Sequence, residues 1–156
     1  MRMEGNAICL GPDIDTDQII AGRYLRTKDR RVWALHVFED LDPGLANRLN
    51  GAVIIAGKNF GCGSSREQAA IALKEAGLGG IIAPSFARIF FRNAINIGLP
   101  LAECSCSCAE GAFVSADLGA GIVELNGERY RIRPLSPRML EILESGGLVE
   151  YWRAKQ

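Results

Sequence analysis

Apolar positions along the chain fall into short runs that are separated by glycine-rich and acidic turns. The runs at Ala52–Ala56, Ile81–Ala83 and Leu99–Glu103 are continuous or nearly so, which is typical of strands buried on both faces. The segments between them, Ser64–Ala76 and Phe86–Ile97, have apolar residues near helical spacing and end at glycines. This order of strand, helix, strand, helix and strand predicts a parallel sheet with crossover helices.

Shorter elements are predicted before this central unit. Ala7–Leu10 is an apolar strand candidate, and Gly11–Asp17 is turn-like, with aspartates at alternate positions. Arg31–Phe38 and Gly44–Leu49 are expected to form short helices joined by a loop.

The pattern changes after Ala112 to short strands and one helix. Asn126-Gly127 is a strong hairpin signal between two of the strands. We therefore expect a mixed α/β fold with parallel and antiparallel strands, forming a single domain over residues 1–156. The expected late elements are strands at Phe113–Ala116, Ile122–Leu125 and Arg129–Ile132 and a helix at Pro137–Glu144, stopped by Gly146-Gly147.

Composition narrows the function classes. Eighteen basic residues balance eighteen acidic ones, so no broad positive field is available to attract nucleic acid or an anionic membrane. No apolar run approaches the roughly 18 residues of a membrane span, and the N-terminus does not resemble a signal peptide. The odd number of cysteines, five, suggests reduced thiols and a cytoplasmic protein.

The most informative segment is Gly57–Glu67, GKNFGCGSSRE, where a buried strand leads through glycines into a helix. This arrangement presents backbone N–H groups and a helix dipole to an anion. Ser64 with Glu67, or Ser65 with Gln68, fits a capping box, which leaves one serine hydroxyl free. A cation at a helix start is unfavourable by roughly 0.3–1 kcal/mol, so Arg66 is expected to have a carboxylate or ligand partner. The alternative is a well-capped helix after a tight turn.

Two long motifs carry a family resemblance. Gly57–Leu101 resembles the swivelling β/β/α domain of the aconitase superfamily, and is most similar to small subunits of 3-isopropylmalate dehydratases and archaeal-type homoaconitases. Gly11–Thr27, GPDIDTDQIIAGRYLRT, is similar to the N-terminal signature of the same subunits. The match covers most of the first 101 residues and is weaker beyond them.

The resemblance implies roles for particular residues. Ser64 would be the general base, and Arg66 would bind a substrate carboxylate. Ser65 would cap the helix or support the base. Asp17 would lie near the active site, with Thr16 supporting it. Such a set suits proton abstraction beside a carboxylate, because fixed cations and N–H groups stabilise the negative charge that develops.

Arg26, in the sequence Tyr24-Leu25-Arg26-Thr27, bears on substrate choice. In the archaeal-type relatives this loop helps to select the variable arm of the substrate. An apolar pair suits an isopropyl group, whereas an arginine resembles the homoaconitase version, which meets a distal carboxylate. The alternative is a solvated loop cation.

Hydroxide removal needs a Lewis acid or a strong general acid, and no metal site is predicted on this chain. His36 is the only histidine, and the spacing of Cys104, Cys106 and Cys108 is not that of common cluster sites, which favours free thiols. The resemblance implies that a [4Fe-4S] cluster belongs to a large-subunit partner, in a heterodimer or heterotetramer. The chain itself is not expected to bind nucleic acid or a membrane.

The expected activity is that of a hydro-lyase that interconverts 2-isopropylmalate and 3-isopropylmalate by dehydration and rehydration in leucine biosynthesis, active only with the large subunit. A homoaconitase-like or broad-specificity dehydratase of small hydroxy-carboxylic acids is the enzymatic alternative. A regulatory or binding module of the same fold is the non-enzymatic one.

Overall fold

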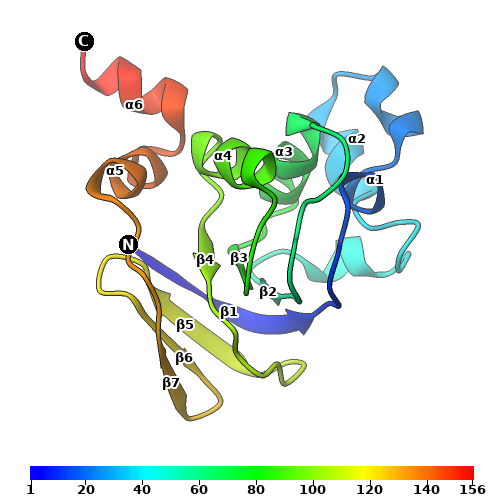
Figure 1. The fold of residues 1–156 in the computed structure, drawn as a ribbon. Helices are drawn as coiled ribbons and strands as arrows, with labels where there is room; N and C mark the ends of the chain where they lie inside the picture. Colours follow the sequence, from blue (N-terminus) through cyan, green and yellow to red (C-terminus); the bar gives the residue numbers. More distant parts are fainter.

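The computed structural model describes all 156 residues and contains one seven-stranded sheet, in the order β4-β3-β2-β1-β5-β6-β7. Strands β1 to β4 are parallel, and β5 to β7 continue the sheet in antiparallel fashion (Figure 1). The mixed α/β prediction is therefore confirmed. The strands are β1 (Arg2–Cys9), β2 (Val53–Ile55), β3 (Gly80–Ala83), β4 (Leu101–Glu103), β5 (Phe113–Asp117), β6 (Ile122–Leu125) and β7 (Glu128–Arg131).

Strand β1 joins the two halves of the sheet. Its first residues pair antiparallel with β5, and Ala7–Cys9 pair parallel with β2. The strand is longer than the predicted Ala7–Leu10, because its first half is a polar and apolar alternation in which Met3 is buried between exposed neighbours. Gly5 allows β1 to lie close to the chain before β2, since a Cβ there would be 2.2 Å from the Gly51 carbonyl oxygen.

The helices of the central unit connect the parallel strands. Helix α3 follows β2 and α4 follows β3, as the apolar pattern predicted. The type I′ hairpin signal at Asn126-Gly127 is also confirmed, with φ of 52° and 82°. The helices are α1 (Thr16–Ile19), α2 (Arg30–Leu35), α3 (Glu67–Glu75), α4 (Arg88–Asn96), α5 (Pro137–Ser145) and α6 (Leu148–Ala154), with 3-10 helices η1 (Gly22–Arg26) and η2 (Leu45–Arg48).

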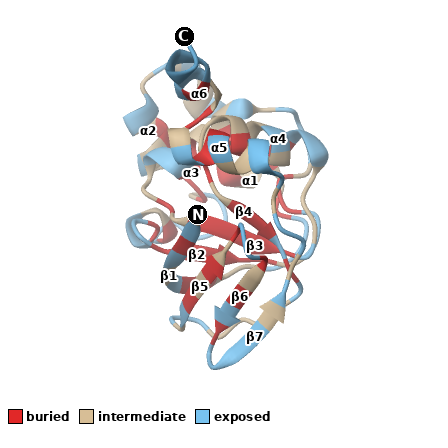
Figure 2. Ribbon diagram, turned by 90° about the vertical axis from the view of Figure 1, so that its left-hand side faces the viewer, coloured by how far each residue is buried: buried red, intermediate tan, exposed pale blue.

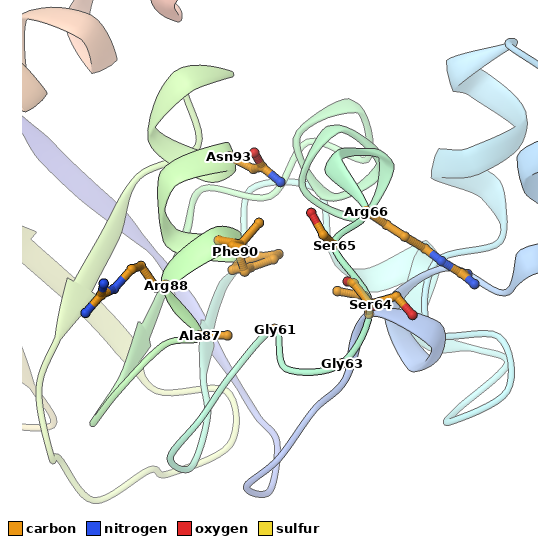
Figure 3. A pocket seen from close by; sticks show the side chains of 11 residues that line it. Gly61, Gly63, Ser64, Ser65, Arg66, Ala87, Arg88, Phe90 and Asn93 are labelled. Carbon is orange, nitrogen blue, oxygen red and sulfur yellow. The ribbon is translucent and has the colours of Figure 1, made fainter.

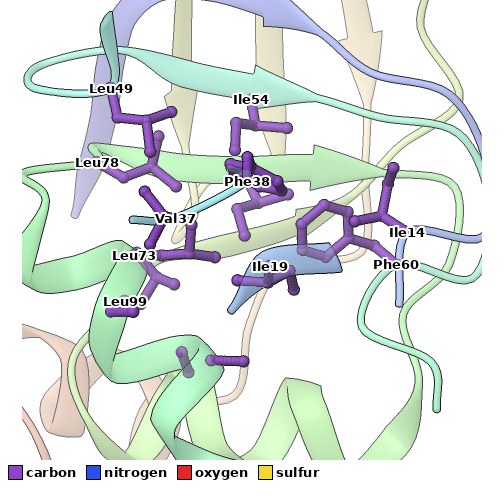
Figure 4. Close-up of a cluster of buried hydrophobic side chains, with 14 of the residues drawn as sticks. Ile14, Ile19, Val37, Phe38, Leu49, Ile54, Phe60, Leu73, Leu78 and Leu99 are labelled. Atoms are coloured by element: carbon purple, nitrogen blue, oxygen red, sulfur yellow. The ribbon is translucent and has the colours of Figure 1, made fainter. Parts of the chain in front are cut away.

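Two apolar clusters bury the two faces of the parallel strands (Figure 2). Ile54 and Ile81 face a cluster that includes Phe38, Phe60 and Leu73, which lies under α1 to α4 (Figure 4). The alternate strand residues face the second cluster, which takes in the antiparallel strands, α5 and α6. Burial on both faces explains why these strands have continuous apolar sequences.

Three sequence predictions about helices were inaccurate. Helix α3 begins at Glu67 rather than Ser64, and α4 begins at Arg88 rather than Phe86. Helix α6 was not predicted, because Gly146-Gly147 was interpreted only as a stop. Gly146 does end α5 in the left-handed conformation, but Gly147 then redirects the chain into a second helix, which buries Tyr151. No helix has the combined length and apolar character that a membrane crossing requires.

The expectation of five reduced thiols was wrong, because Cys9 and Cys108 form a disulfide. The segment before β5 lies against the end of β1, where Gly111 N–H donates to the Ala7 carbonyl and Cys9 N–H donates to the Glu110 carboxylate. These contacts bring the two cysteine Cα atoms to 5.9 Å, within the usual range for a disulfide. Cys62, Cys104 and Cys106 are free.

Candidate functional site

The glycine-serine-arginine turn lies beyond the carboxyl ends of the parallel strands, where α/β proteins commonly bind ligands. Isolated parallel bridges continue the sheet into this region, pairing Asp15 with Cys62 and Phe60 with Phe86. The strand order β3-β2-β1 thus brings together the two sequence motifs, whose Thr16 and Ser64 are 48 residues apart in the chain.

The N-terminal motif braces the serine turn through three hydrogen bonds. Gly61 N–H donates to the Ile14 carbonyl at 2.7 Å, and Thr16 N–H donates to the Cys62 carbonyl at 2.9 Å. The Thr16 hydroxyl, which is buried, donates to the Ser64 carbonyl at 2.9 Å. Thr16 is itself held at the first position of α1, which Asp15 caps with a complete capping box. The backbone carrying Ser64 is therefore fixed from the Thr16 side.

Gly61 fixes the turn from the α4 side. Its φ is +84°, and a Cβ there would lie 2.2 Å from Cγ of Phe90. Phe90 is buried and packs edge-to-face on Phe60. Any side chain at position 61 would thus be strained by the backbone and would displace the first turn of α4.

The predicted capping boxes of Ser64 and Ser65 are absent. Arg66 is the N-cap residue of α3, in extended conformation, and no side chain bonds to the N–H groups of the first turn. The hydrogen bonds from the N-terminal motif hold residues 61–64 in a turn in which Gly61 and Gly63 have positive φ, so helical geometry begins later than the sequence pattern indicates. As a result both serine hydroxyls, on exposed residues, are released from capping.

Arg66 has the carboxylate partner that its position predicted. Its Nη1 lies 2.8 Å from Oδ1 of Asp17. This nitrogen is buried, yet its N–H groups are not aligned for a hydrogen bond with any acceptor. The close ion pair holds the guanidinium, while donor capacity remains for a further carboxylate.

A cleft of about 200 Å³ lies between the first turns of α3 and α4. The N-cap residue of α4, Ala87, provides no side-chain cap either, so two helix N-termini present free N–H groups to the same region. We call it the Ser64 cleft; its lining residues are Thr16, Gly61, Gly63, Ser64, Ser65, Arg66, Ala87, Arg88, Ile89, Phe90 and Asn93.

The side chains of Ser65 and Arg66 lie on opposite sides of the glycine-serine-arginine turn. In Figure 3, Ser65 and Asn93 point toward one another across the cleft, whereas Arg66 extends away from α4. The head of Arg66 lies beside Gly22, whose Cβ position would be 3.6 Å from Nη1. Sequence reasoning did not single out Asn93, because helical spacing alone cannot show that the first turns of α3 and α4 meet.

Two predicted site residues do not line the Ser64 cleft: Asp17, which contacts it only through its ion pair with Arg66, and Arg26. Arg26 lies at the end of η1, is exposed, and takes part in no ion pair. The loop is anchored instead by Arg23, which bonds to Glu39 and Asp40, and by Tyr24, which stacks on His36 at 4.0 Å.

This anchor is centred on Glu39. Its carboxylate accepts from the Tyr24 hydroxyl, lies 2.5 Å from His36 Nδ1 and pairs with Arg23 at 2.9 Å. The hydrogen bond from Tyr24, followed by those from His36 and Arg23, lowers the pKa of Glu39 from its ordinary 4.5 to about 2. His36 therefore contributes to the anchor of this loop.

The cysteines after β4 do not form a metal-binding group. Burial raises the pKa of the Cys104 thiol to about 12 and also raises the pKa of Cys106, so both stay protonated at neutral pH. Cys108 is engaged in the disulfide. No group of three or more His, Cys, Asp or Glu side chains is arranged to hold a metal ion.

Chemically, the site combines an exposed hydroxyl, a partly satisfied guanidinium and two helix N-termini. Such a site can hold a carboxylate and stabilise negative charge beside it. It is open to solvent at Ser64, so a hydroxyl acting as a base there needs a cover that excludes water.

Comparison with known proteins gives independent evidence about the family of this chain. The aconitase C-terminal domain family matches residues 15–103. A 3-isopropylmalate dehydratase small subunit of Moorella thermoacetica is 50% identical, over 97% of this chain and 95% of that protein. A methanogen homoaconitase small subunit of Methanothermobacter thermautotrophicus is also 50% identical, over 96% of this chain and 90% of its own length.

A solved structure has the same fold. The crystal structure of 3-isopropylmalate dehydratase from Methanocaldococcus jannaschii superimposes with a TM-score of 0.93 at 42% identity, covering 99% of this chain and 95% of that one. The similarity therefore includes the antiparallel strands and α5–α6, where the sequence motifs alone were weak.

Proposed function

Because the chain belongs to the aconitase C-terminal domain family, we propose that it is the small subunit of a 3-isopropylmalate dehydratase. The activity is that of a hydro-lyase that interconverts 2-isopropylmalate and 3-isopropylmalate in leucine biosynthesis. Small subunits of this name match over nearly the whole chain. The observation that carries the proposal is the braced Ser64-Ser65-Arg66 turn, with free hydroxyls and a guanidinium held beside Asp17.

In this proposal Ser64 removes the proton from the substrate carbon and returns it. The positive ends of α3 and α4 lower the free energy of an alkoxide at this position and of the charge that develops on the substrate. Arg66 binds a substrate carboxylate through its Nε and Nη2 donors, because Nη1 is buried and paired with Asp17. The Thr16 hydroxyl positions Ser64 by donating to the Ser64 carbonyl. Ser65 faces Asn93 within the cleft.

A [4Fe-4S] cluster is proposed to lie on the large subunit. The relatives are named small subunits, which implies a separate large subunit, and Cys108 of this chain is engaged in a disulfide. When bound, such a cluster supplies the Lewis acid that assists departure of the substrate hydroxyl. This chain supplies the base, the arginine that binds the substrate carboxylate, and one of the two surfaces that enclose the substrate. Residues 1–156 are proposed to move as one swivelling domain onto the large subunit, in the cytoplasm.

Homoaconitase activity is the second candidate. It is favoured by the exposed Arg26, whose guanidinium has no partner within the chain, and by the homoaconitase small subunit that is 50% identical. An arginine with free donors suits a substrate whose variable arm ends in a carboxylate.

The test is turnover by this chain mixed anaerobically with its cluster-loaded large subunit. Rates with 3-isopropylmalate, homocitrate and homoisocitrate are compared at equal concentration. Turnover of isopropylmalate alone supports the primary proposal, and preference for the tricarboxylates supports the second. A complex that forms but turns over none of the three contradicts both and favours a regulatory module.

A further inference from the structure

A second hollow runs between α4 and α5, which pack against each other. Its volume is about 400 Å³. The floor is apolar, formed by Phe91, Ile95, Met139 and Ile142. The rim carries three guanidinium groups and no carboxylate. We call it the α4–α5 groove; its lining residues are Arg88, Phe91, Arg92, Ile95, Asn96, Ser136, Arg138, Met139 and Ile142.

The three rim arginines have no ion-pair partner within the chain, whereas five of the other eleven arginines do. Arg88, Arg92 and Arg138 are exposed and lie within no ion pair. In contrast, five arginines elsewhere have a carboxylate within 4 Å: Arg23, Arg31, Arg48, Arg66 and Arg129. The formal net charge of the chain is zero, so the uncompensated positive charge at the groove is a local feature.

The groove adjoins the Ser64 cleft. Arg88 lines both hollows, because the first turn of α4 separates them. A macromolecule that covers the Ser64 cleft and excludes water from it would therefore extend over the groove. Large buried interfaces commonly combine an apolar centre with arginines that recognise carboxylates on the partner.

We propose that the α4–α5 groove is a docking site for an apolar segment of the large subunit that carries aspartate or glutamate side chains. Its apolar residues cover Phe91 and Met139, and its carboxylates pair with Arg92 and Arg138. This inference rests on the proposed function, because it requires a large subunit. The charge complementarity selects the correct docked orientation and speeds association.

The test is a charge reversal that leaves the Ser64 cleft unchanged. Arg92→Glu/Arg138→Glu is compared with the matched control Arg133→Glu/Arg153→Glu, which makes the same change in net charge at exposed residues outside the groove. Affinity for the cluster-loaded large subunit is measured by titration of activity and by calorimetry. We expect the groove variant to raise Kd by about tenfold to a hundredfold, with kcat at saturating large subunit unchanged.

Met139→Ser tests the apolar floor and is expected to raise Kd by a smaller factor. Thermal unfolding of each variant alone verifies that the fold is retained. If the groove and control variants bind the large subunit equally well, the inference is overturned. A fully active wild-type complex would in that case still support the proposed function. A change in the oligomeric state of the isolated groove variant alone, with normal binding to the large subunit, would overturn it in favour of self-association. Failure of the wild-type chain to bind any large subunit would overturn the proposed function instead.

Discussion

Two loops near the parallel strand ends differ in how the protein holds their arginines. Arg66 is at the end of a braced turn, paired with Asp17 and fixed through Thr16 and Gly61. Arg26 ends a 3-10 helix whose anchors are Arg23 and Tyr24, and its own side chain is free. In the proposed function, the residues that perform the common chemistry are preorganised, whereas the residue proposed to select the variable part of the substrate has only a fixed backbone.

The largest effect is expected from removal of the Ser64 hydroxyl. Ser64→Ala should lower kcat by about 10³–10⁴-fold, because proton transfer loses its base. Ser65→Ala is the matched control and should have a smaller effect, since Ser65 faces Asn93 rather than the Arg66 side. Affinity for the large subunit should be unchanged in both. Full activity of Ser64→Ala would show that the base assignment is wrong.

The next largest effect is expected from Arg66→Lys. The ammonium group retains the charge but cannot pair with Asp17 and a substrate carboxylate in the planar geometry of a guanidinium. We expect the variant to lose about 2–4 kcal/mol of transition-state stabilisation, which is measured as a fall in kcat/KM. Steady-state kinetics on the reconstituted enzyme provides the measurement, and an unchanged kcat/KM would rule out the carboxylate clamp.

Arg26→Val should change selectivity more than rate. If Arg26 meets a distal carboxylate, the ratio of kcat/KM for homoisocitrate to that for 3-isopropylmalate should fall by about 10–100-fold. Lys28→Ala, at an exposed cation of the same loop, serves as the control. Equal ratios in wild type and the Arg26 variant would make Arg26 a solvated loop cation and end the specificity argument.

Thr16→Val tests the brace rather than the chemistry. The valine retains the shape of the threonine but leaves the Ser64 carbonyl without its donor, at a cost of about 1 kcal/mol. We expect kcat to fall by about fivefold with little change in KM, because Ser64 is less well positioned. Thr16→Ser, which restores a hydroxyl, should recover most of kcat. A rise in KM with an unchanged kcat would instead indicate that Thr16 contacts the substrate directly.

The two loops also show how far sequence reasoning extends. The central strands were predicted within two residues at each end, because burial on both faces leaves continuous apolar runs. The carboxylate partner of Arg66 followed from the unfavourable position of a cation at a helix start. The late start of α3, the disulfide and the contribution of Asn93 were not predictable. Each depends on contacts between segments far apart in the chain, which local patterns do not encode.

The smallest effect concerns the anchor of the Arg26 loop and has a distinct pH signature. The pKa of Glu39 is lowered from 4.5 to about 2 in the folded protein, so its ionised form stabilises the fold above about pH 4.5. This stabilisation decreases as the pH falls below 4.5 and is lost as the pH falls through about 2, where the carboxylate becomes protonated in the folded state as well.

Glu39→Gln should therefore lower Tm by a small, constant amount at neutral and mildly acidic pH, and the difference from wild type should shrink as the pH falls below 4.5. Thermal unfolding followed by circular dichroism over this range provides the measurement. Asp42→Asn, in an exposed ion pair with Arg48, is a control for general loss of a surface charge. Because the anchor holds the backbone and not the Arg26 head, Glu39→Gln should also blunt substrate selectivity without reversing it. A Tm difference that is independent of pH would show that packing of Tyr24 and His36, rather than the Glu39 charge, holds the loop.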